Sequence, residues 1–219
     1  MSRFNFPLKL VSKLGAILAF GILLSACAVG NKYDYKDQPI DLAASSDQKI
    51  GVSVVDQRIY IVSGEKPADF VGLQRGGFGN PFDVNTKSGG PMADSFAFAI
   101  AEGLKSRGID AGVVLTSPTS NRAEVRGQVI AGDFSKYLIV YLTEWKSDTL
   151  VNVKFIYDIT AEVVAKNGTV LAVNKMENTE VLGGDFGNPP AFAKENIPIA
   201  FRRVMKELIS DPAILAALK

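Results

Sequence analysis

Residues 151–164, VNVKFIYDITAEVV, carry the clearest structural signal in the sequence. Their odd-numbered positions are apolar, whereas most of their even-numbered positions are polar. Strict alternation of this kind predicts a strand that buries one face, as in an antiparallel sheet. Asn167-Gly168 is a strong signal for a two-residue hairpin turn, so residues 169–176 should form the antiparallel partner. We expect the odd-numbered face, which includes Phe155, to pack against helices.

Periodic segments on either side of this hairpin predict the rest of the fold. Alternating apolar residues predict strands, and apolar residues on one helical face predict helices. The predicted strands are residues 49–56, 111–115, 123–133 and 137–145, and the predicted helices are residues 91–107, residues 197–209 and a short helix after Asp211-Pro212. This order predicts an α+β fold: an antiparallel sheet of about five to six strands with two main helices packed on one face, plus a short C-terminal helix.

Residues 63–90 are rich in glycine and lack a sustained period, which predicts a long irregular loop. A loop of this length in a compact domain is usually functional or disordered. Its phenylalanines argue against disorder, because the free energy of burying apolar rings would then be lost. The tetrapeptide Phe-Gly-Asn-Pro occurs at residues 78–81 and again at residues 186–189. We expect the first copy, together with Phe82, to form an ordered and partly exposed lip.

The N-terminus has the organisation of a secretory signal. Residues 1–13 are basic without an acid, and residues 14–24 form an apolar run that is too short to span a bilayer as a helix. Leu24-Ser25-Ala26-Cys27 then contains the only cysteine of the chain. This tetrapeptide resembles the lipobox of bacterial lipoproteins.

The lipobox resemblance implies cleavage before Cys27, diacylglycerol on its sulfur and an acyl group on the new amine. Two or more acyl chains anchor a protein stably to a membrane, whereas one binds reversibly. The alternative is an ordinary secretory signal with a chance cysteine. In Gram-negative lipoproteins an aspartate after the cysteine favours retention in the inner membrane, so Ala28 favours the periplasmic face of the outer membrane. The expected organisation is a signal peptide at residues 1–26, a flexible tether at residues 27–47 and one α+β periplasmic domain at residues 48–219.

Composition narrows the possible chemistry. The chain has 24 basic and 23 acidic residues, and three of the bases lie in residues 1–26, which leaves a formal charge of −2 for residues 27–219. This near balance argues against nucleic-acid binding. The chain has no histidine, which excludes Ser-His-Asp and Cys-His catalysis and zinc sites built on histidine. Carboxylate chemistry, Ser-Lys chemistry and oxygen-ligated metals remain open.

Two short motifs suggest catalysis or phosphate binding but lack the surroundings that such sites need. Residues 46–49 fit Ser-x-x-Lys, yet they precede a predicted strand, without the helix or the companion motifs of penicillin-binding proteins. Residues 76–80 are glycine-rich but lack the lysine of a phosphate-binding loop. We therefore predict that the protein is not an enzyme and has no cofactor or metal.

The order of elements resembles the YajG-like family of outer-membrane lipoproteins. The matching features are the lipobox at residues 24–27, the strand at residues 50–54 with Asp56-Gln57-Arg58 after it, Arg107-Gly108-Ile109 at a helix end, the Asn167-Gly168 hairpin and the closing helix before Asp211. Residues 63–90 and 144–149 depart from the family pattern. The resemblance implies a location and an architecture, but no biochemical activity.

Together these features predict a non-catalytic lipid-anchored envelope lipoprotein that binds another envelope component, either a protein or the cell wall, from the periplasmic side. The alternative is an accessory lipoprotein subunit of an envelope transport or secretion complex. The expected partners are membrane lipid, through acylated Cys27, and an envelope protein. Candidate partner-binding residues are Phe78, Asn80, Phe82 and Trp145, although a core position for Trp145 is an equal alternative because tryptophan is highly buried on average.

Overall fold

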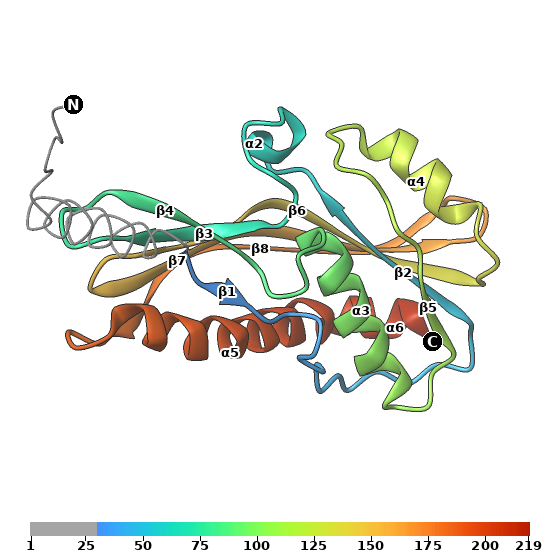
Figure 1. The fold of residues 1–219 in the computed structure, drawn as a ribbon. Helices are drawn as coiled ribbons and strands as arrows, with labels where there is room; N and C mark the ends of the chain where they lie inside the picture. The colour runs from blue at the N-terminus through green and yellow to red at the C-terminus, as the bar shows by residue number, and fades with distance from the viewer. Residues whose placement is uncertain (1–29) are drawn as a thin grey trace, which may run out of the picture.

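The computed structural model describes residues 30–219, so the lipobox and Cys27 lie outside the described residues. Figure 1 shows a long curled sheet with helices on both of its faces. The elements are β1 (Lys32–Tyr33), β2 (Ile50–Asp56), α2 (Ile59–Val62), β3 (Phe70–Arg75), β4 (Pro81–Thr86), α3 (Met92–Lys105), β5 (Ala111–Val113), α4 (Arg122–Ile130), β6 (Lys136–Thr149), β7 (Asn152–Ala165), β8 (Val170–Gly184), α5 (Pro189–Ile209) and α6 (Pro212–Leu218).

The predicted fold class is wrong. The eight described strands form one mixed sheet, in which β1-β4-β3-β6-β2-β5 is one path and β7 and β8 continue from β6. Four of the strand pairs are parallel, namely β1·β4, β2·β5, β2·β6 and β3·β6. Alternation identifies a half-buried strand but not its partner, and β2 reaches β6 through crossover connections that make the pairing parallel.

The predicted hairpin is confirmed. β7 and β8 pair antiparallel, and β6 pairs antiparallel with the other edge of β7. The odd-numbered face of β7, with Phe155 and Ile159, is fully buried in the main core. β8 extends to Gly184, well beyond the end predicted from its apolar pattern.

Two predicted segments have a different secondary structure. Residues 63–90 are not one long loop, because β3 and β4 form an antiparallel hairpin within them. Residues 123–133 were expected to be a strand, but α4 occupies most of them. Val125 and Val129 are the two buried residues of α4, and their i, i+4 spacing places them on one helical face. The side chain of Asn121 caps this helix by accepting a hydrogen bond from the backbone N–H of Glu124.

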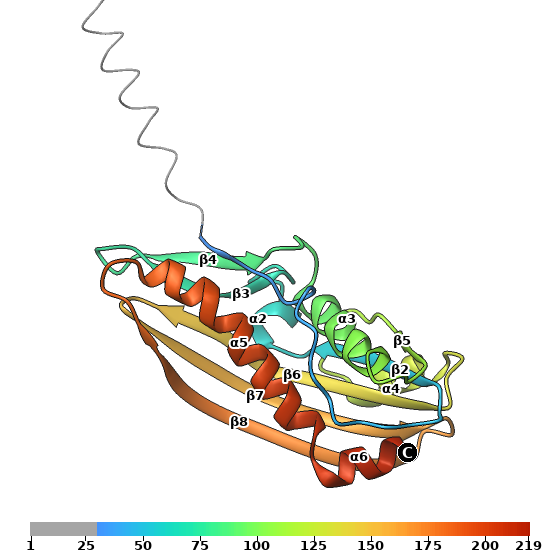
Figure 2. The same cartoon turned by 90° about the horizontal axis from the view of Figure 1, so that it is seen from below.

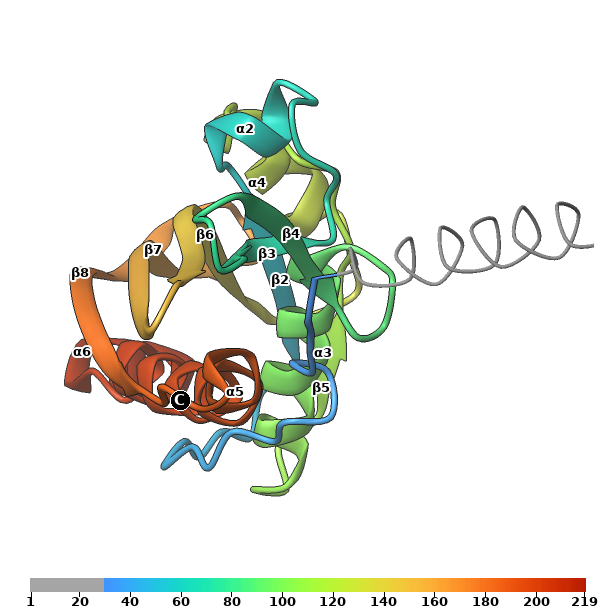
Figure 3. The ribbon, with the colours of Figure 1, turned by 60° about the vertical axis from the view of Figure 1, so that its left-hand side comes forward.

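Helices cover both faces of the sheet rather than one. Helices α3, α5 and α6 share the main core on the concave face, whereas α4 packs over Tyr137, Ile139 and Tyr141 on the opposite face. Figure 3 shows how β6, β7 and β8 curl around α5. Trp145 lies at the centre of the main core, with ring centroids 4.9 Å from Phe96 and 4.8 Å from Phe155.

The predicted flexible tether is wrong for residues 30–47. Tyr33, Tyr35, Ile40 and Leu42 are buried in the main core, and β1 pairs in parallel with β4. The apolar residues of this segment are irregularly spaced among charges, so no periodic signal distinguishes it from a polar linker. The folded part of the chain therefore extends to Gly30. Within residues 30–219, no helix is both long and apolar enough to cross a membrane.

Candidate functional site

Three chain turns gather at one end of the sheet. Gln74, near the end of β3, is in parallel register with Thr149 at the end of β6, so the turns after these two strands lie together. Asn152, at the start of β7, is paired with Gly184 at the end of β8. The connections are residues 76–80, 150–151 and 185–188, and we call this region the three-turn end. Figure 2 shows it on the same side of the molecule as the start of the described chain.

Each turn of this end presents one large apolar side chain to solvent. The exposed fractions are 103% for Phe78, 50% for Leu150 and 93% for Phe186. Large apolar side chains exposed together on a soluble domain mark interaction surfaces, whereas single ones are ordinary. The three-turn end is therefore a candidate binding surface.

The turns are held by defined contacts and are not free tips. Arg75 and Asp148 form a bidentate ion pair, with both N–O distances at 2.6 Å, which joins the ends of β3 and β6. Gly79 has a φ of 81°, which a side chain would disfavour, and its backbone N–H bonds the carbonyl of Gly76. The rings at this end are consequently presented by an ordered surface.

The start of the described chain is clamped beside these turns. The backbone N–H of Asn31 donates to the side chain of Gln74 at 3.3 Å, and its side-chain amide donates to the carbonyl of Pro190 at 2.5 Å. At Gly30 a Cβ would lie 2.0 Å from the carbonyl oxygen of Asp83, so only glycine fits this approach. Residues 30 and 31 are thus fixed between the β3–β4 hairpin and the first turn of α5.

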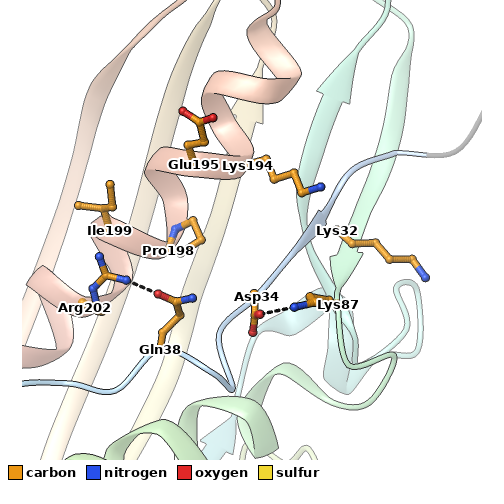
Figure 4. A pocket seen from close by; sticks show the side chains of 9 residues that line it. All are labelled: Lys32, Asp34, Gln38, Lys87, Lys194, Glu195, Pro198, Ile199 and Arg202. Carbon is orange, nitrogen blue, oxygen red and sulfur yellow. Dashed lines mark hydrogen bonds and ion pairs between the residues drawn. The ribbon is translucent and has the colours of Figure 1, made fainter.

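A groove of about 610 Å³ lies between this clamped segment and α5. Figure 4 shows its lining, which includes four cationic and two acidic side chains. We call it the cationic groove; its residues are Lys32, Asp34, Gln38, Lys87, Lys194, Glu195, Pro198, Ile199 and Arg202.

The positive charges of the cationic groove are only partly compensated. Lys87 is paired with Asp34 at 2.7 Å, and this hydrogen bond and charge raise the pKa of Lys87. Arg202 donates to the neutral amide of Gln38. Among the described residues, Lys32 and Lys194 form no ion pair. The groove therefore favours an anionic ligand over a cationic one.

A second cleft, of about 400 Å³, lies between α2 and the β3–β4 hairpin. Three of its four charged side chains form ion pairs, namely Lys66, Asp83 and Lys146, whereas Glu65 forms none among the described residues. Lys66 bonds Asp83 at 2.7 Å, and the hydroxyl of Tyr60 donates to Glu144. Burial is the main reason that the pKa of Tyr60 is raised. The charged side chains that line this cleft sum to zero, whereas those of the cationic groove sum to +2.

A buried ion pair lies beneath this second cleft. Arg58 binds Asp56 with an N–O distance of 2.6 Å, and its guanidinium also donates to the carbonyls of Phe70 and Trp145. Burial lowers the pKa of Arg58, but the hydrogen bonds and charge of Asp56 outweigh it and raise the pKa overall. Since these contacts join β2, β3 and β6, the pair has a structural role. Within residues 30–219, no cluster of acidic side chains is arranged to hold a metal ion.

The predicted site residues do not form one surface in the structure. Phe78 and Asn80 are exposed on the turn between β3 and β4, and Phe82 is half-buried on β4. Trp145 is fully buried, and its indole N–H donates to the hydroxyl of Tyr35 at 3.3 Å. Trp145 as a partner-binding anchor is therefore wrong, and the alternative of a core residue is correct. Aromatic content alone could not distinguish these positions.

Sequence reasoning missed the other members of the site. Leu150 and Phe186 complete the three-turn end, and Lys32 and Lys194 belong to the groove. The repeated Phe-Gly-Asn-Pro was the available signal, although its first copy leads into strand β4 and only the second leads into a helix. The groove carries no local motif, because tertiary packing brings its side chains together.

Comparisons with known proteins leave the family open. No protein-family model matches the chain, and no curated protein matches it. Protein XCC0632 from Xanthomonas campestris is similar at 13% identity over 86% of this chain and 93% of that one, with a TM-score of 0.48.

Two further solved structures are more distant in TM-score. The PelC dodecamer from Paraburkholderia phytofirmans has 14% identity over 78% of this chain and 91% of that one, with a TM-score of 0.41. Lipoprotein GNA1162 from Neisseria meningitidis has 12% identity over 69% of this chain and 96% of that one, with a TM-score of 0.28. These values assign neither a family nor a function, and the YajG-like resemblance stays a prediction.

Proposed function

We propose that this chain is a non-catalytic, lipid-anchored protein of the bacterial envelope that binds another envelope component through its three-turn end. One observation carries the proposal. Gly30, three residues after the cysteine of the lipobox, is already packed against Asp83 of the β3–β4 hairpin, and Asn31 bonds Gln74 and Pro190, which flank the turns of Phe78 and Phe186. An anchor on Cys27 would therefore lie near the end of the molecule that carries the candidate binding surface.

The distance from anchor to domain is short. Each extended residue spans at most about 3.3–3.6 Å, so Cys27 and Gly30 are separated by at most about 11 Å. The headgroup region adds only about 5–8 Å to each side of the hydrocarbon core. An acyl anchor on Cys27 would consequently hold the domain directly against the periplasmic face of the outer membrane.

A binding role is favoured over catalysis by the residues that are available. The chain contains no histidine, and two acids at the cleft beside α2 are engaged: Asp83 by Lys66, and Glu144 by Tyr60 and Lys146. Catalytic sites instead gather titratable groups whose perturbed pKa values are directed at a substrate.

Fatty-acid labelling in cells tests the anchor. Radiolabelled palmitate should be incorporated into the wild-type protein and not into Cys27→Ser, and the variant should leave the membrane fraction because its acylated thiol is lost. Unlabelled wild-type protein, or full membrane retention of the unlabelled variant, would contradict the lipid anchor.

Photo-crosslinking in cells tests the binding surface. A photoreactive side chain at Phe78 should form adducts with an envelope component, whereas one at Val173 should form few. Val173 is a suitable control because it is exposed on β8, near the hairpin that closes the opposite end of the sheet. Equal adduct formation at both positions would refute the assignment of the surface.

A further inference from the structure

We propose that the envelope component bound by the three-turn end is the anionic membrane surface itself. Phe78, Leu150 and Phe186 enter the headgroup layer, and the cationic groove takes lipid phosphates. This inference rests on the proposed function, because it requires the acyl anchor on Cys27. It adds the ligand: phosphate-bearing lipid headgroups of the leaflet that holds the anchor.

The reach of the chain places this surface at the membrane. Lys32 is five residues from Cys27, so at most about 18 Å of extended chain separates the first groove cation from the lipidated sulfur. Asn31 bonds both Gln74 and Pro190, which flank the first and third turns. The anchor would therefore keep Asn31, and the ends of β3 and α5 that it contacts, close to the leaflet.

The distribution of the apolar side chains fits a fluid surface better than a protein partner. The surface presents only three large apolar side chains, one on each of its turns. A specific protein interface usually buries about 800 Å² on each partner and fills its core with contiguous apolar side chains. A few Phe and Leu side chains can instead enter the headgroup boundary of a bilayer, as they do on the apolar faces of interfacial helices.

The basic side chains of the cationic groove are a second reason to infer a lipid ligand. Lys32, Lys194 and Arg202 have no carboxylate partner among the described residues, and each lies in the groove next to the clamped start of the chain. Lys194 follows the second Phe-Gly-Asn-Pro within the first turns of α5. Basic side chains within a Debye length of an anionic leaflet are attracted to it. Phosphate groups of lipids match both the sign of the groove and its position.

Lipid-borne quenching measures the contact. The full-length lipidated protein is reconstituted into vesicles of phosphatidylcholine with phosphatidylglycerol, with an environment-sensitive fluorophore attached at Phe78→Cys or Phe186→Cys. Acylation of Cys27 keeps its thiol from reacting with the dye. A nitroxide on the lipid headgroups should quench the fluorophore at both positions and leave a fluorophore at Val173→Cys largely unquenched. Equal quenching at Phe78 and Val173 would overturn the inference.

Charge-neutralising variants test the groove. In anionic vesicles, Lys32→Gln with Lys194→Gln should lose much of the quenching at position 78, whereas Lys105→Gln with Lys219→Gln should retain it. The control pair changes the net charge equally and lies away from the groove residues. In vesicles of phosphatidylcholine alone, both double variants should match the parent protein. An equal loss in the two double variants would show a general charge effect and overturn the role of the groove.

Two further measurements separate the possible ligands. Titration of the vesicle-free protein with inorganic phosphate should give no saturable binding below millimolar concentration; tight binding of the free ion would identify the groove as a phosphate site and overturn the lipid assignment. Crosslinking from position 78 in cells should yield lipid adducts, and one defined protein adduct in their place would overturn this inference but preserve the proposed function. Absence of fatty acid on Cys27 would overturn both.

Discussion

Two groups of aromatic side chains in this molecule differ in their exposure to solvent. Phe96, Trp145, Phe155 and Phe201 lie in the interior, where the centroids of Phe96 and Phe201 are 4.4 Å apart. Phe78 and Phe186 are almost wholly exposed at the three-turn end. The interior rings come from strands and helices that contribute whole apolar faces, whereas the exposed rings come from glycine-containing turns. The comparison shows that the element carrying a ring, rather than the ring itself, decides whether the ring is buried or exposed.

The largest difference should appear when one ring of each group is removed. Phe155→Ala should reduce the free energy of unfolding by roughly 3–5 kcal/mol, because it leaves a cavity in the main core. Phe78→Ala should change it by less than about 0.5 kcal/mol, because the ring makes no buried contact. Urea denaturation of the two variants measures the contrast. A loss below about 1 kcal/mol for Phe155→Ala would mean that this face of β7 is not core.

Charged side chains in the interior should likewise contribute more to stability than those on the surface. Asp56→Asn should cost about 3 kcal/mol, because it leaves the buried guanidinium of Arg58 without its counter-charge. Lys32→Gln should change stability by less than about 0.5 kcal/mol, since its side chain is exposed. Denaturant titration provides the measurement. Equal stabilities of the two variants would remove the structural role that we assign to the pair.

A smaller effect tests the contacts that fix residues 30 and 31 beside the three-turn end. Gly30→Ala should cost about 1–3 kcal/mol, because the new Cβ would overlap the carbonyl of Asp83. Gly77→Ala is the matched control, since nothing lies within 4 Å of a Cβ at that position. Thermal unfolding and limited proteolysis of β1 report the effect. If the two variants behaved alike, the start of the chain would not be fixed as described.

The smallest expected effect on stability accompanies the largest effect on binding. Phe78→Ser with Phe186→Ser should lower the free energy of unfolding by less than about 1 kcal/mol in total, because both sites are exposed turns. The same double variant should lose the crosslinked adducts and the lipid quenching. Circular dichroism melts and the vesicle assay measure the two outcomes. Unfolding of the double variant would show that these rings are part of the core.

The hairpin of β7 and β8 and the helices α3 and α5 could be predicted from the sequence because each presents a strong periodic apolar face. We predicted that helix α5 begins at residue 197, because proline is common in a first helical turn and Pro198 follows. The helix starts at Pro189 instead, after an Asn188 cap, and Pro198 lies in its interior. The parallel pairing of β2 with β6 depends on long-range packing, which short windows of sequence do not contain.

The candidate site was predictable only in part. The turn with Phe78 attracted attention because glycine and phenylalanine occur together there, and the repeated tetrapeptide pointed to Phe186. The burial of residues 30–47 could not be predicted, because Tyr33, Tyr35 and Ile40 are spaced irregularly among charges. This error concealed the contacts that fix residues 30 and 31 beside the three-turn end.

The immersion of the exposed rings tests the central claim most directly. A spin label at position 78 of the anchored protein in anionic vesicles is compared with one at position 173, using oxygen as the lipid-soluble relaxant and a nickel chelate as the aqueous one. We predict that the label at position 78 is more accessible to oxygen than to the chelate, and that the label at position 173 shows the reverse. Preferential access of the chelate at both positions would contradict a membrane-bound three-turn end.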